Sequence, residues 1–390
     1  MNKSGMIKYE FIDALRGLAV LGVIFTHSAV VVVPSSAMLQ WFATEGARGV
    51  QLFYIASALT LCLSWVARRP HEVSPIRNFF IRRFFRIAPM FYFAIVLYIC
   101  VNGFSPTSEA PNGIKWWFIP VTVLFLHGFH PETINGIVHG GWSIAVEMMF
   151  YLLLPFLMLY VKTIKLCVIF FIGSVVLYGL NKFILADLFF YPESQHALVQ
   201  KFVFFNFFGQ LPVFFIGIFC YLIFLRNYSA KYMAIVGGLF FIVLLGLFVN
   251  PVFKFLPKIF RFLPHHIIAG MLFSVFALIL GRWPVRFFVN RITTMFGKIS
   301  FSMYLVHFAI LTVFSRLGFM AFVPKSDFAS ILYVFCVVLS SAFVSLFLHK
   351  YIEKPGVAMG SRLIGKAEGV VVLASNITNN AGDVSILKGR

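Results

Sequence analysis

Charged residues are scarce in this sequence. Only 12% of its 390 residues are Asp, Glu, Lys or Arg, about half the share usual in a soluble domain, and 61% are hydrophobic. A chain with so few charges cannot cover its whole length with a water-exposed surface, which excludes an ordinary soluble protein. Apolar runs near the ~20 residues that cross a bilayer recur along the chain, so the first run is one span among many and not a cleaved signal peptide.

Three further features are missing. The five cysteines all lie inside apolar runs without C-x-x-C pairing, so neither a disulfide framework nor a metal site is indicated. The sequence contains no P-loop and no dinucleotide-binding fingerprint. Acidic residues number only 13 against 32 Lys and Arg, which gives a formal net charge of +19. Most of these basic residues lie between apolar runs, so they indicate membrane topology and not nucleic-acid binding.

The apolar runs predict an all-α fold, a polytopic transmembrane bundle of about ten spanning helices that forms one membrane domain over 1–365. The expected spans are 12–33, 50–67, 87–101, 142–161, 165–185, 203–225, 231–249, 266–281, 299–321 and 329–350. Segment 116–129 is shorter and carries a central Pro120, so we expect it to be re-entrant or interfacial.

The distribution of basic residues predicts the orientation. With the N-terminus inside the cell, all but nine of the 32 basic residues fall on the cytoplasmic side, which agrees with the positive-inside rule. Both termini are therefore predicted to be cytoplasmic. Residues 366–390 lose the apolar pattern and are expected to form a loosely ordered cytoplasmic tail.

Ionisable side chains within the spans are functional candidates, because each costs on the order of 3 kcal/mol at the bilayer centre. Arg16 and His27 lie eleven residues apart in the first span, so they share one helix face about 16 Å apart, with Asp13 one turn before Arg16. An imidazole can take a proton from a hydroxyl near neutral pH, which makes His27 the candidate catalytic base. From the pair alone, helix-to-helix hydrogen bonding by His27 and membrane anchoring by Arg16 are equally well supported.

A second candidate group opens the span at 142–161. Trp142 and Ser143 begin it, and Glu147 follows about one turn inside. We expect Glu147 in the same half of the membrane as His27, where its carboxylate would orient the imidazole or position the acceptor. A protonated structural carboxyl is the alternative, but acids are rare in spans and function is favoured.

A basic cluster lies between the second and third spans. The spacing of Arg82, Arg83 and Arg86 indicates guanidinium groups along one helix face on the cytoplasmic side. Such a surface fits the phosphates of an acyl carrier such as coenzyme A. Anchoring to anionic lipid headgroups is the commoner use of such a cluster.

Three late residues are further candidates. Tyr304 and His307 lie in the span at 299–321, and Glu353 comes after the last span. Hydrogen bonding between helices is slightly favoured for His307, and an interfacial salt bridge for Glu353.

Five segments, in order along the chain, resemble the signatures of acyltransferase family 3. This family of membrane proteins includes O-acetylases of O-antigen, exopolysaccharide and peptidoglycan. The segments are 11–19 with Arg16 followed by His27, 49–58, 82–89, Trp142-Ser143 with Glu147, and 297–307. The second segment departs from the family pattern, since Gln51 stands where many relatives carry an acid, and Ala56 and Ala58 replace a common Leu and Gly.

The resemblance implies transfer of an acyl group, usually acetyl, from cytoplasmic acetyl-CoA to a hydroxyl of a cell-envelope glycan at the bacterial inner membrane. It makes His27 the base, gives Arg16 a role in holding the donor or orienting the site, and assigns the donor phosphates to Arg82, Arg83 and Arg86. No metal is implied. Because we see no added esterase-like domain in the chain, we expect the acceptor to be a sugar on a lipid carrier, acylated directly or with a separate partner.

Two other functions stay open at this stage. A transporter or flippase of lipid-linked sugars would also have ten to twelve helices with buried charges, but it is often built from two related halves, and no repeat is found. Acyl transfer to a small molecule or a lipid would use the same residues. A purely structural membrane protein is disfavoured by the ionisable face of the first span.

Overall fold

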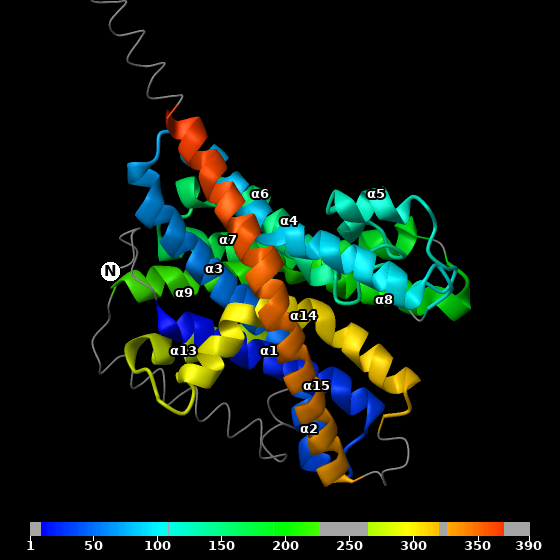
Figure 1. Ribbon diagram of the computed structural model, residues 1–390. Coiled ribbons are helices and arrows are strands. Elements are labelled where there is room, and N and C mark those ends of the chain that lie inside the picture. The colour runs from blue at the N-terminus through cyan, green and yellow to red at the C-terminus, as the bar shows by residue number, and fades with distance from the viewer. Residues whose placement is uncertain (1–8, 108, 190, 227–263, 320–325, 370–390) are drawn as a thin grey trace, which may run out of the picture.

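The computed structural model describes residues 9–107, 109–189, 191–226, 264–319 and 326–369, and within these ranges the chain is helical and without strands (Figure 1). The helices are α1 (Glu10–Val31), α2 (Ala37–Gly46), α3 (Gly49–Arg68), α4 (Pro75–Asn102), α5 (Phe118–Val123), α6 (Trp142–Tyr160), α7 (Ile164–Leu188), α8 (His196–Phe205), α9 (Phe207–Arg226), α13 (His265–Arg282), α14 (Arg291–Arg316) and α15 (Asp327–Leu348). The predicted all-α class is confirmed.

Nine helical stretches of the described residues are long and apolar enough to cross a membrane. They correspond to nine of the ten predicted spans, and the remaining one, 231–249, lies outside the described residues. Segment 116–129 contains only α5 and a short 3-10 turn, Leu126–Phe129, both too short to cross. The chain is therefore a multi-pass integral membrane protein. The side on which its termini lie stays a prediction.

Helix α1 lies within the bundle and packs closely against α14 through glycine. A β-carbon at Gly297 would lie 1.7 Å from the carbonyl oxygen of Asp13, and one at Gly17 would lie 2.0 Å from that of Thr293. Any side chain at either glycine would force the helices apart, so glycine permits this close approach. Helices α1 and α14 therefore lie side by side, and the candidate site residues of both helices lie along this contact.

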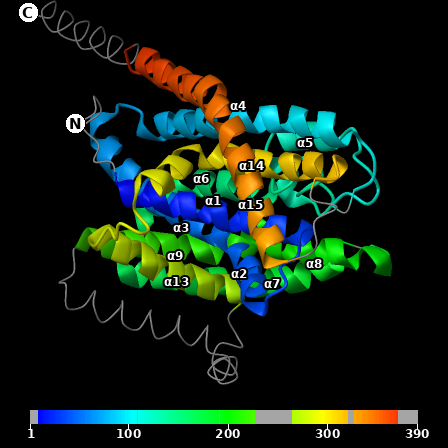
Figure 2. The ribbon, with the colours of Figure 1, turned by 60° about the horizontal axis from the view of Figure 1, so that its bottom comes forward.

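The last helix is unusually long. From α15 it continues through a π-helical turn, His349–Glu353, into a final helical segment, 354–369, so that Asp327–Gly369 is one stretch of 43 residues. Its length of about 65 Å is twice what the hydrocarbon core needs, so one end extends beyond that core at any usual tilt. Figure 2 shows its last turns projecting past the neighbouring helices. This segment includes 366–369, the start of the predicted loose tail, and 370–390 lie outside the described residues.

Candidate active site

Two cavities lie inside the bundle and meet at a shared wall formed by Val50 and Tyr304, which line both. The first, about 270 Å³, is lined by Arg16, Arg83 and Arg86, and we call it the arginine cavity. Its polar lining residues are Arg16, Tyr54, Ser57, Thr60, Arg83, Arg86, Ser143, Glu147, Tyr151, Ser300 and Tyr304. The second, about 680 Å³, contains His27 and His139 and is called the histidine cavity. Because α1 contributes Arg16 to one and His27 to the other, the cavities lie toward opposite ends of this helix.

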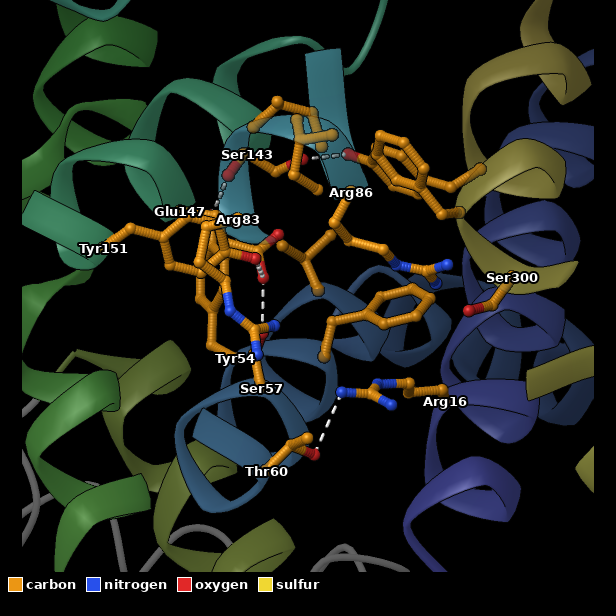
Figure 3. A pocket seen from close by; sticks show the side chains of 16 residues that line it. Arg16, Tyr54, Ser57, Thr60, Arg83, Arg86, Ser143, Glu147, Tyr151 and Ser300 are labelled. Atoms are coloured by element: carbon orange, nitrogen blue, oxygen red, sulfur yellow. Dashed lines mark hydrogen bonds between the residues drawn. The ribbon is translucent and has the colours of Figure 1, made fainter. Parts of the chain in front are cut away.

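Arg16 reaches the arginine cavity from the first turns of α1. Its Nη2 donates a hydrogen bond to the Thr60 hydroxyl at 3.0 Å, and its Nη1 lies 3.8 Å from the Asp13 carboxylate one turn earlier. The Asp13 carboxylate therefore pairs with the positive charge of Arg16. Figure 3 shows the Arg16 guanidinium pointing across the cavity from the α1 side.

Helix α4 supplies two further guanidinium groups to this cavity. Arg83 lies 5.7 Å from the ring centre of Phe79 and 5.8 Å from that of Tyr151, so aromatic faces flank its cation. Arg86 donates to the buried carboxylate of Glu353 at 3.0 Å. In Figure 3 the side chains of Arg16, Arg83 and Arg86 approach one space from different sides.

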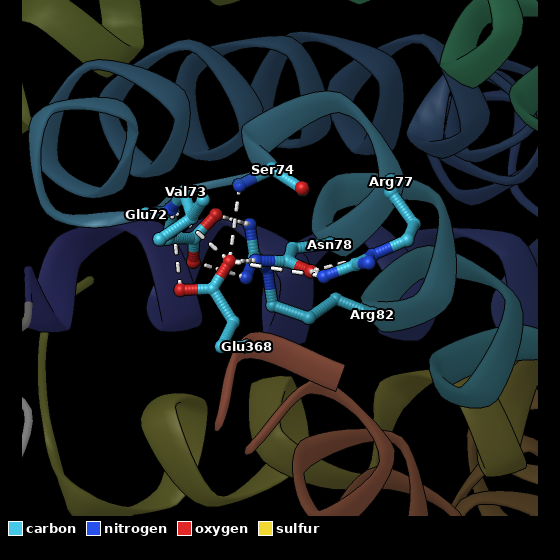
Figure 4. Close-up of polar contacts among 7 residues, drawn as sticks. All are labelled: Glu72, Val73, Ser74, Arg77, Asn78, Arg82 and Glu368. Carbon is cyan, nitrogen blue, oxygen red and sulfur yellow. Dashed lines mark hydrogen bonds and ion pairs between the residues drawn. The ribbon is translucent and has the colours of Figure 1, made fainter. Parts of the chain in front are cut away.

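Arg82 belongs to a different environment. Its guanidinium makes two hydrogen bonds to the Glu72 carboxylate, the longer one 3.1 Å, and it does not line the arginine cavity (Figure 4). Of the three arginines expected to contact a donor together, the structure brings two into the cavity. The third, Arg82, points about 100° away from Arg83 around the helix and is held outside the cavity by Glu72.

Glu147 also lines the arginine cavity, and the structure does not bring it to His27. Its carboxylate accepts hydrogen bonds from the hydroxyls of Ser57 and, at 2.6 Å, Tyr151. The physical reason is the depth at which α6 starts. The Tyr54 hydroxyl, inside the bundle, donates to the carbonyl of the second residue of α6 at 3.3 Å, so one further turn carries Glu147 past the wall.

Three imidazoles surround the ring of Phe308 beside the histidine cavity. The ring centres of His27, His139 and His307 lie 4.3, 5.7 and 4.2 Å from that of Phe308, and those of His27 and His307 lie 5.5 Å apart. His307 Nδ1 lies 2.6 Å from the Tyr304 carbonyl, an acceptor, which assigns the ring hydrogen to Nδ1. Among the described residues Nε2 of His307 then has a free lone pair and no hydrogen-bond partner. No group of metal-ligating side chains in the described ranges is arranged to hold a metal.

Sequence reasoning missed His139 as a site residue. It lies outside the spanning helices, and burial lowers its pKa, an effect that the charge of Glu109 partly opposes, so the imidazole is neutral at neutral pH. A signal was present in the glycine that comes next in the chain. Gly140 has φ +77°, and a β-carbon there would lie 3.0 Å from the Tyr304 hydroxyl. Glycine at this position lets the chain turn and brings His139 into the cavity.

Hydrogen bonds reinforce the wall. The Tyr304 hydroxyl donates to the Gly140 carbonyl at 3.0 Å and accepts from the Ser143 hydroxyl at 2.9 Å. Trp142 lines the histidine cavity, where its ring stacks on Phe205 at 4.5 Å between centres, and Ser143 lines the arginine cavity. The two residues that begin α6 therefore face the two cavities.

Comparison with known proteins identifies related chains. Residues 9–350 match the acyltransferase 3 family model, described as an acyltransferase domain, and this range includes all five resembling segments. A protein of Staphylococcus aureus (strain COL), named "Putative O-acetyltransferase SACOL0978", is 26% identical over 354 residues, which cover 80% of this chain and 53% of that protein. "Peptidoglycan O-acetyltransferase OatA" of Listeria monocytogenes is 29% identical over 171 residues, 40% of this chain and 25% of that protein. The chain thus spans about half the length of the Staphylococcus relative. No solved structure matches.

Proposed function

Because the chain belongs to the acyltransferase 3 family, we propose that it is a membrane O-acyltransferase that moves an acetyl group from acetyl-CoA to a hydroxyl of a cell-envelope glycan. One observation carries the proposal. A cavity with three guanidinium groups meets a cavity with neighbouring imidazoles at a wall of two residues, Val50 and Tyr304. Such a pair of cavities lets an anionic donor and a hydroxyl acceptor approach from opposite sides of the membrane and react where they meet.

The arginine cavity suits the donor. Arg16, Arg83 and Arg86 supply positive charge for the phosphates of coenzyme A, and guanidinium forks match phosphate oxygens well. The cavity lies toward the ends of α1 and α4 that the positive-inside rule places in the cytoplasm, where acetyl-CoA is present. With the phosphates held there, the pantetheine arm would carry the thioester toward the wall.

The histidine cavity suits the acceptor and the proton transfer. The His27 imidazole takes the proton of the acceptor hydroxyl while the hydroxyl oxygen attacks the carbonyl carbon of the thioester. An oxygen–carbon bond forms, the carbon–sulfur bond breaks, and the departing coenzyme A thiolate takes the proton back from the imidazolium. His139 and His307, both close to the same phenylalanine ring, are candidates to assist this transfer.

The lining of the histidine cavity supports a sugar as the acceptor. It combines aromatic side chains with polar ones, among them Trp142, Phe205, Asn135 and Ser315, which provide flat faces and hydrogen-bonding groups for a ring bearing hydroxyls. The Listeria relative is named as an O-acetyltransferase of a glycan, peptidoglycan. A sugar on a lipid carrier at the inner membrane is the acceptor that we propose here.

The test uses purified wild-type protein and His27→Ala, each given radiolabelled acetyl-CoA and total cell-envelope glycolipid. His265→Ala is the matched control, because His265 is an exposed histidine at the start of α13. We expect label in glycan with the wild type and the control and none with His27→Ala. Label in a small lipid would revise the acceptor. A His27→Ala protein with full activity would contradict the proposed base, and movement of unmodified lipid-linked sugar across sealed vesicles without acetyl transfer would favour a flippase.

A further inference from the structure

Glu368, near the end of the last described helix, caps the helix that carries Arg83 and Arg86. Glu368 accepts hydrogen bonds from the backbone N–H groups of Val73 at 3.1 Å and Ser74 at 3.0 Å, and from the Asn78 side chain at 2.7 Å (Figure 4). These groups lie at the start of α4, where backbone N–H groups lack partners within the helix and a negative charge is favourable. Ser74, the residue that precedes α4, provides no side-chain cap among the described contacts. A carboxylate nearly 300 residues further along the chain takes that place.

A second carboxylate fixes one of the donor arginines directly. Glu353, which is 1% exposed, accepts from Arg86 at 3.0 Å and lies 3.1 Å from His349 Nδ1, and the Ser302 hydroxyl also donates to it. Glu353 ends the π-helical turn of the last helix. The extra residue of such a turn rotates the rest of the helix about its axis, and π-turns often occur at functional positions.

Between these two carboxylates, the last helix packs tightly on α4 through glycine. A β-carbon at Gly356 would lie 2.8 Å from Pro89 Cγ, and one at Gly360 would lie 2.8 Å from Phe85 Cβ. Phe85 and Pro89 are neighbours of Arg86 in α4. The segment 354–369 therefore contacts α4 at its start, at Phe85 and at Pro89, although it lies beyond residue 350, where the family match ends.

We propose that the segment 354–369, together with Glu353, positions the donor-binding arginines. Glu368 holds the first turn of α4, the glycines set its distance, and Glu353 orients the Arg86 guanidinium toward the cavity. Glu353 and Glu368 are thus positioning residues that act on acetyl-CoA through α4. This inference rests on the proposed function, because it takes coenzyme A as the ligand of the arginine cavity.

The sign of the effect separates positioning from simple charge balance. Glu353→Gln removes a negative charge paired with Arg86, and Glu368→Gln removes one at the start of α4. If these carboxylates only offset positive charge, their removal would strengthen the binding of an anionic donor. If they position α4, their removal weakens that binding while the chemistry at His27 continues, so that KM for acetyl-CoA rises and kcat holds.

The experiment measures the Kd of coenzyme A, and the KM and kcat for acetyl-CoA, with full-length purified protein. We expect Kd and KM to rise about tenfold for Glu353→Gln and about threefold for Glu368→Gln, with kcat within about twofold of wild type. Glu10→Gln, at an exposed glutamate that begins α1, is the matched control and should leave all three values unchanged. Gly360→Ala should raise Kd, whereas Gly365→Ala should not, because no described atom lies within 4 Å of its added β-carbon.

The outcomes distinguish failure of the positioning role from failure of the proposed function. If coenzyme A binds the wild type and all variants equally, or binds the two Glu variants more tightly, the positioning role is overturned and the proposed function stands. If coenzyme A does not bind the wild type, the proposed donor fails and the inference fails with it. Should Glu353→Gln not accumulate in the membrane, Glu368→Gln and the glycine pair decide, since Glu368 is only partly buried.

Discussion

The two cavities differ in what holds their functional side chains. In the arginine cavity, Arg16 and Arg86 have named polar partners, a hydroxyl for the first and a buried carboxylate for the second. In the histidine cavity, His27 and His139 lie against the ring of Phe308. Ion pairs and hydrogen bonds fix the direction of a charge, which serves the binding of an anion. Aromatic packing fixes the place of an imidazole and leaves its nitrogens available for proton transfer.

Because the two cavities differ in this way, we expect substitutions in them to affect different kinetic constants. Changes in the arginine cavity should alter donor affinity, and changes in the histidine cavity should alter turnover. Substitutions at the base, at a donor arginine, at the wall and at the segment bordering the histidine cavity test whether that division holds, with the largest effect expected at the base.

Replacing the base should affect the histidine cavity alone. We expect His27→Gln to lower kcat about a thousandfold, because general base catalysis contributes of that order, and to leave the Kd of coenzyme A unchanged. Single-turnover transfer and equilibrium binding, measured on one preparation, test this. Loss of coenzyme A binding in the variant would break the division between the cavities.

Replacing a donor arginine should do the reverse. Arg83→Gln should raise the KM for acetyl-CoA about thirtyfold, the effect of losing a charge-assisted hydrogen bond, with a small change in kcat. Arg82→Gln is the control, because Arg82 is paired with Glu72 outside the cavity and should change KM far less. Steady-state kinetics of both variants check the prediction, and equal effects would restore Arg82 as a donor contact.

A substitution in the wall should lower both turnover and stability, with a smaller effect than those at His27 and Arg83. Tyr304→Phe removes the hydroxyl that bonds to Gly140 and Ser143, and leaves two buried polar groups without that partner. We expect about a tenfold loss of kcat and a loss of roughly 1 kcal/mol in stability, the usual cost of one such hydrogen bond. Thermal unfolding in detergent and transfer assays measure the two effects. A variant as active as wild type would remove Tyr304 from the reaction path.

The smallest effect concerns the segment between α4 and α6 that borders the histidine cavity. Burial opposes ionisation of Glu132, but hydrogen bonds from Lys115 at 2.9 Å and Asn112 at 2.7 Å outweigh it, so its pKa is lower than the usual 4.5. A lowered pKa in the folded state stabilises the protein above pH 4.5, and the contribution disappears as the pH falls through that lowered pKa.

We therefore expect Glu132→Gln to lose at most about 1 kcal/mol at neutral pH, since Lys115 is partly exposed and solvent screens the pair. Thermal unfolding of wild type and variant at a series of pH values measures the difference. The two stabilities should converge in acid. A difference that persists in strong acid, well below the usual pKa of 4.5, would show that the loss is due to packing and not to charge.

Much of the fold could be predicted from hydrophobicity. The apolar runs predicted nine spans that the structure describes, because the bilayer imposes a length and a polarity on each helix. The shared face of Arg16 and His27 was also predictable, since helical periodicity within one helix is fixed. Arg16 lines the arginine cavity and His27 the histidine cavity, and their roles in the reaction stay predictions.

Relations between helices could not be predicted in the same way. The depth of Glu147 depends on where α6 starts within the bundle, and that start is set by the irregular segment before it, which has no period to interpret. His139 lies in the same irregular segment, so no helical pattern identified it as a site residue. Arg82 separates from Arg83 and Arg86 because of Glu72, a partner that spacing along a helix does not reveal. Glu368 contacts α4 across nearly the whole length of the chain, and no local pattern predicts such a contact.

The wall of Val50 and Tyr304 has an electrical consequence. The proposed function has the donor and the acceptor enter from opposite faces of the membrane, and with both cavities hydrated in that way most of the membrane potential falls across this short stretch of protein. Moving one elementary charge through 100 mV changes its energy by about 2.3 kcal/mol. Both side chains that form the wall are uncharged, and so is Ser143, which donates to Tyr304. The insulating layer at its thinnest point is therefore made of neutral groups, and a neutral acetyl group can cross it at a rate independent of voltage.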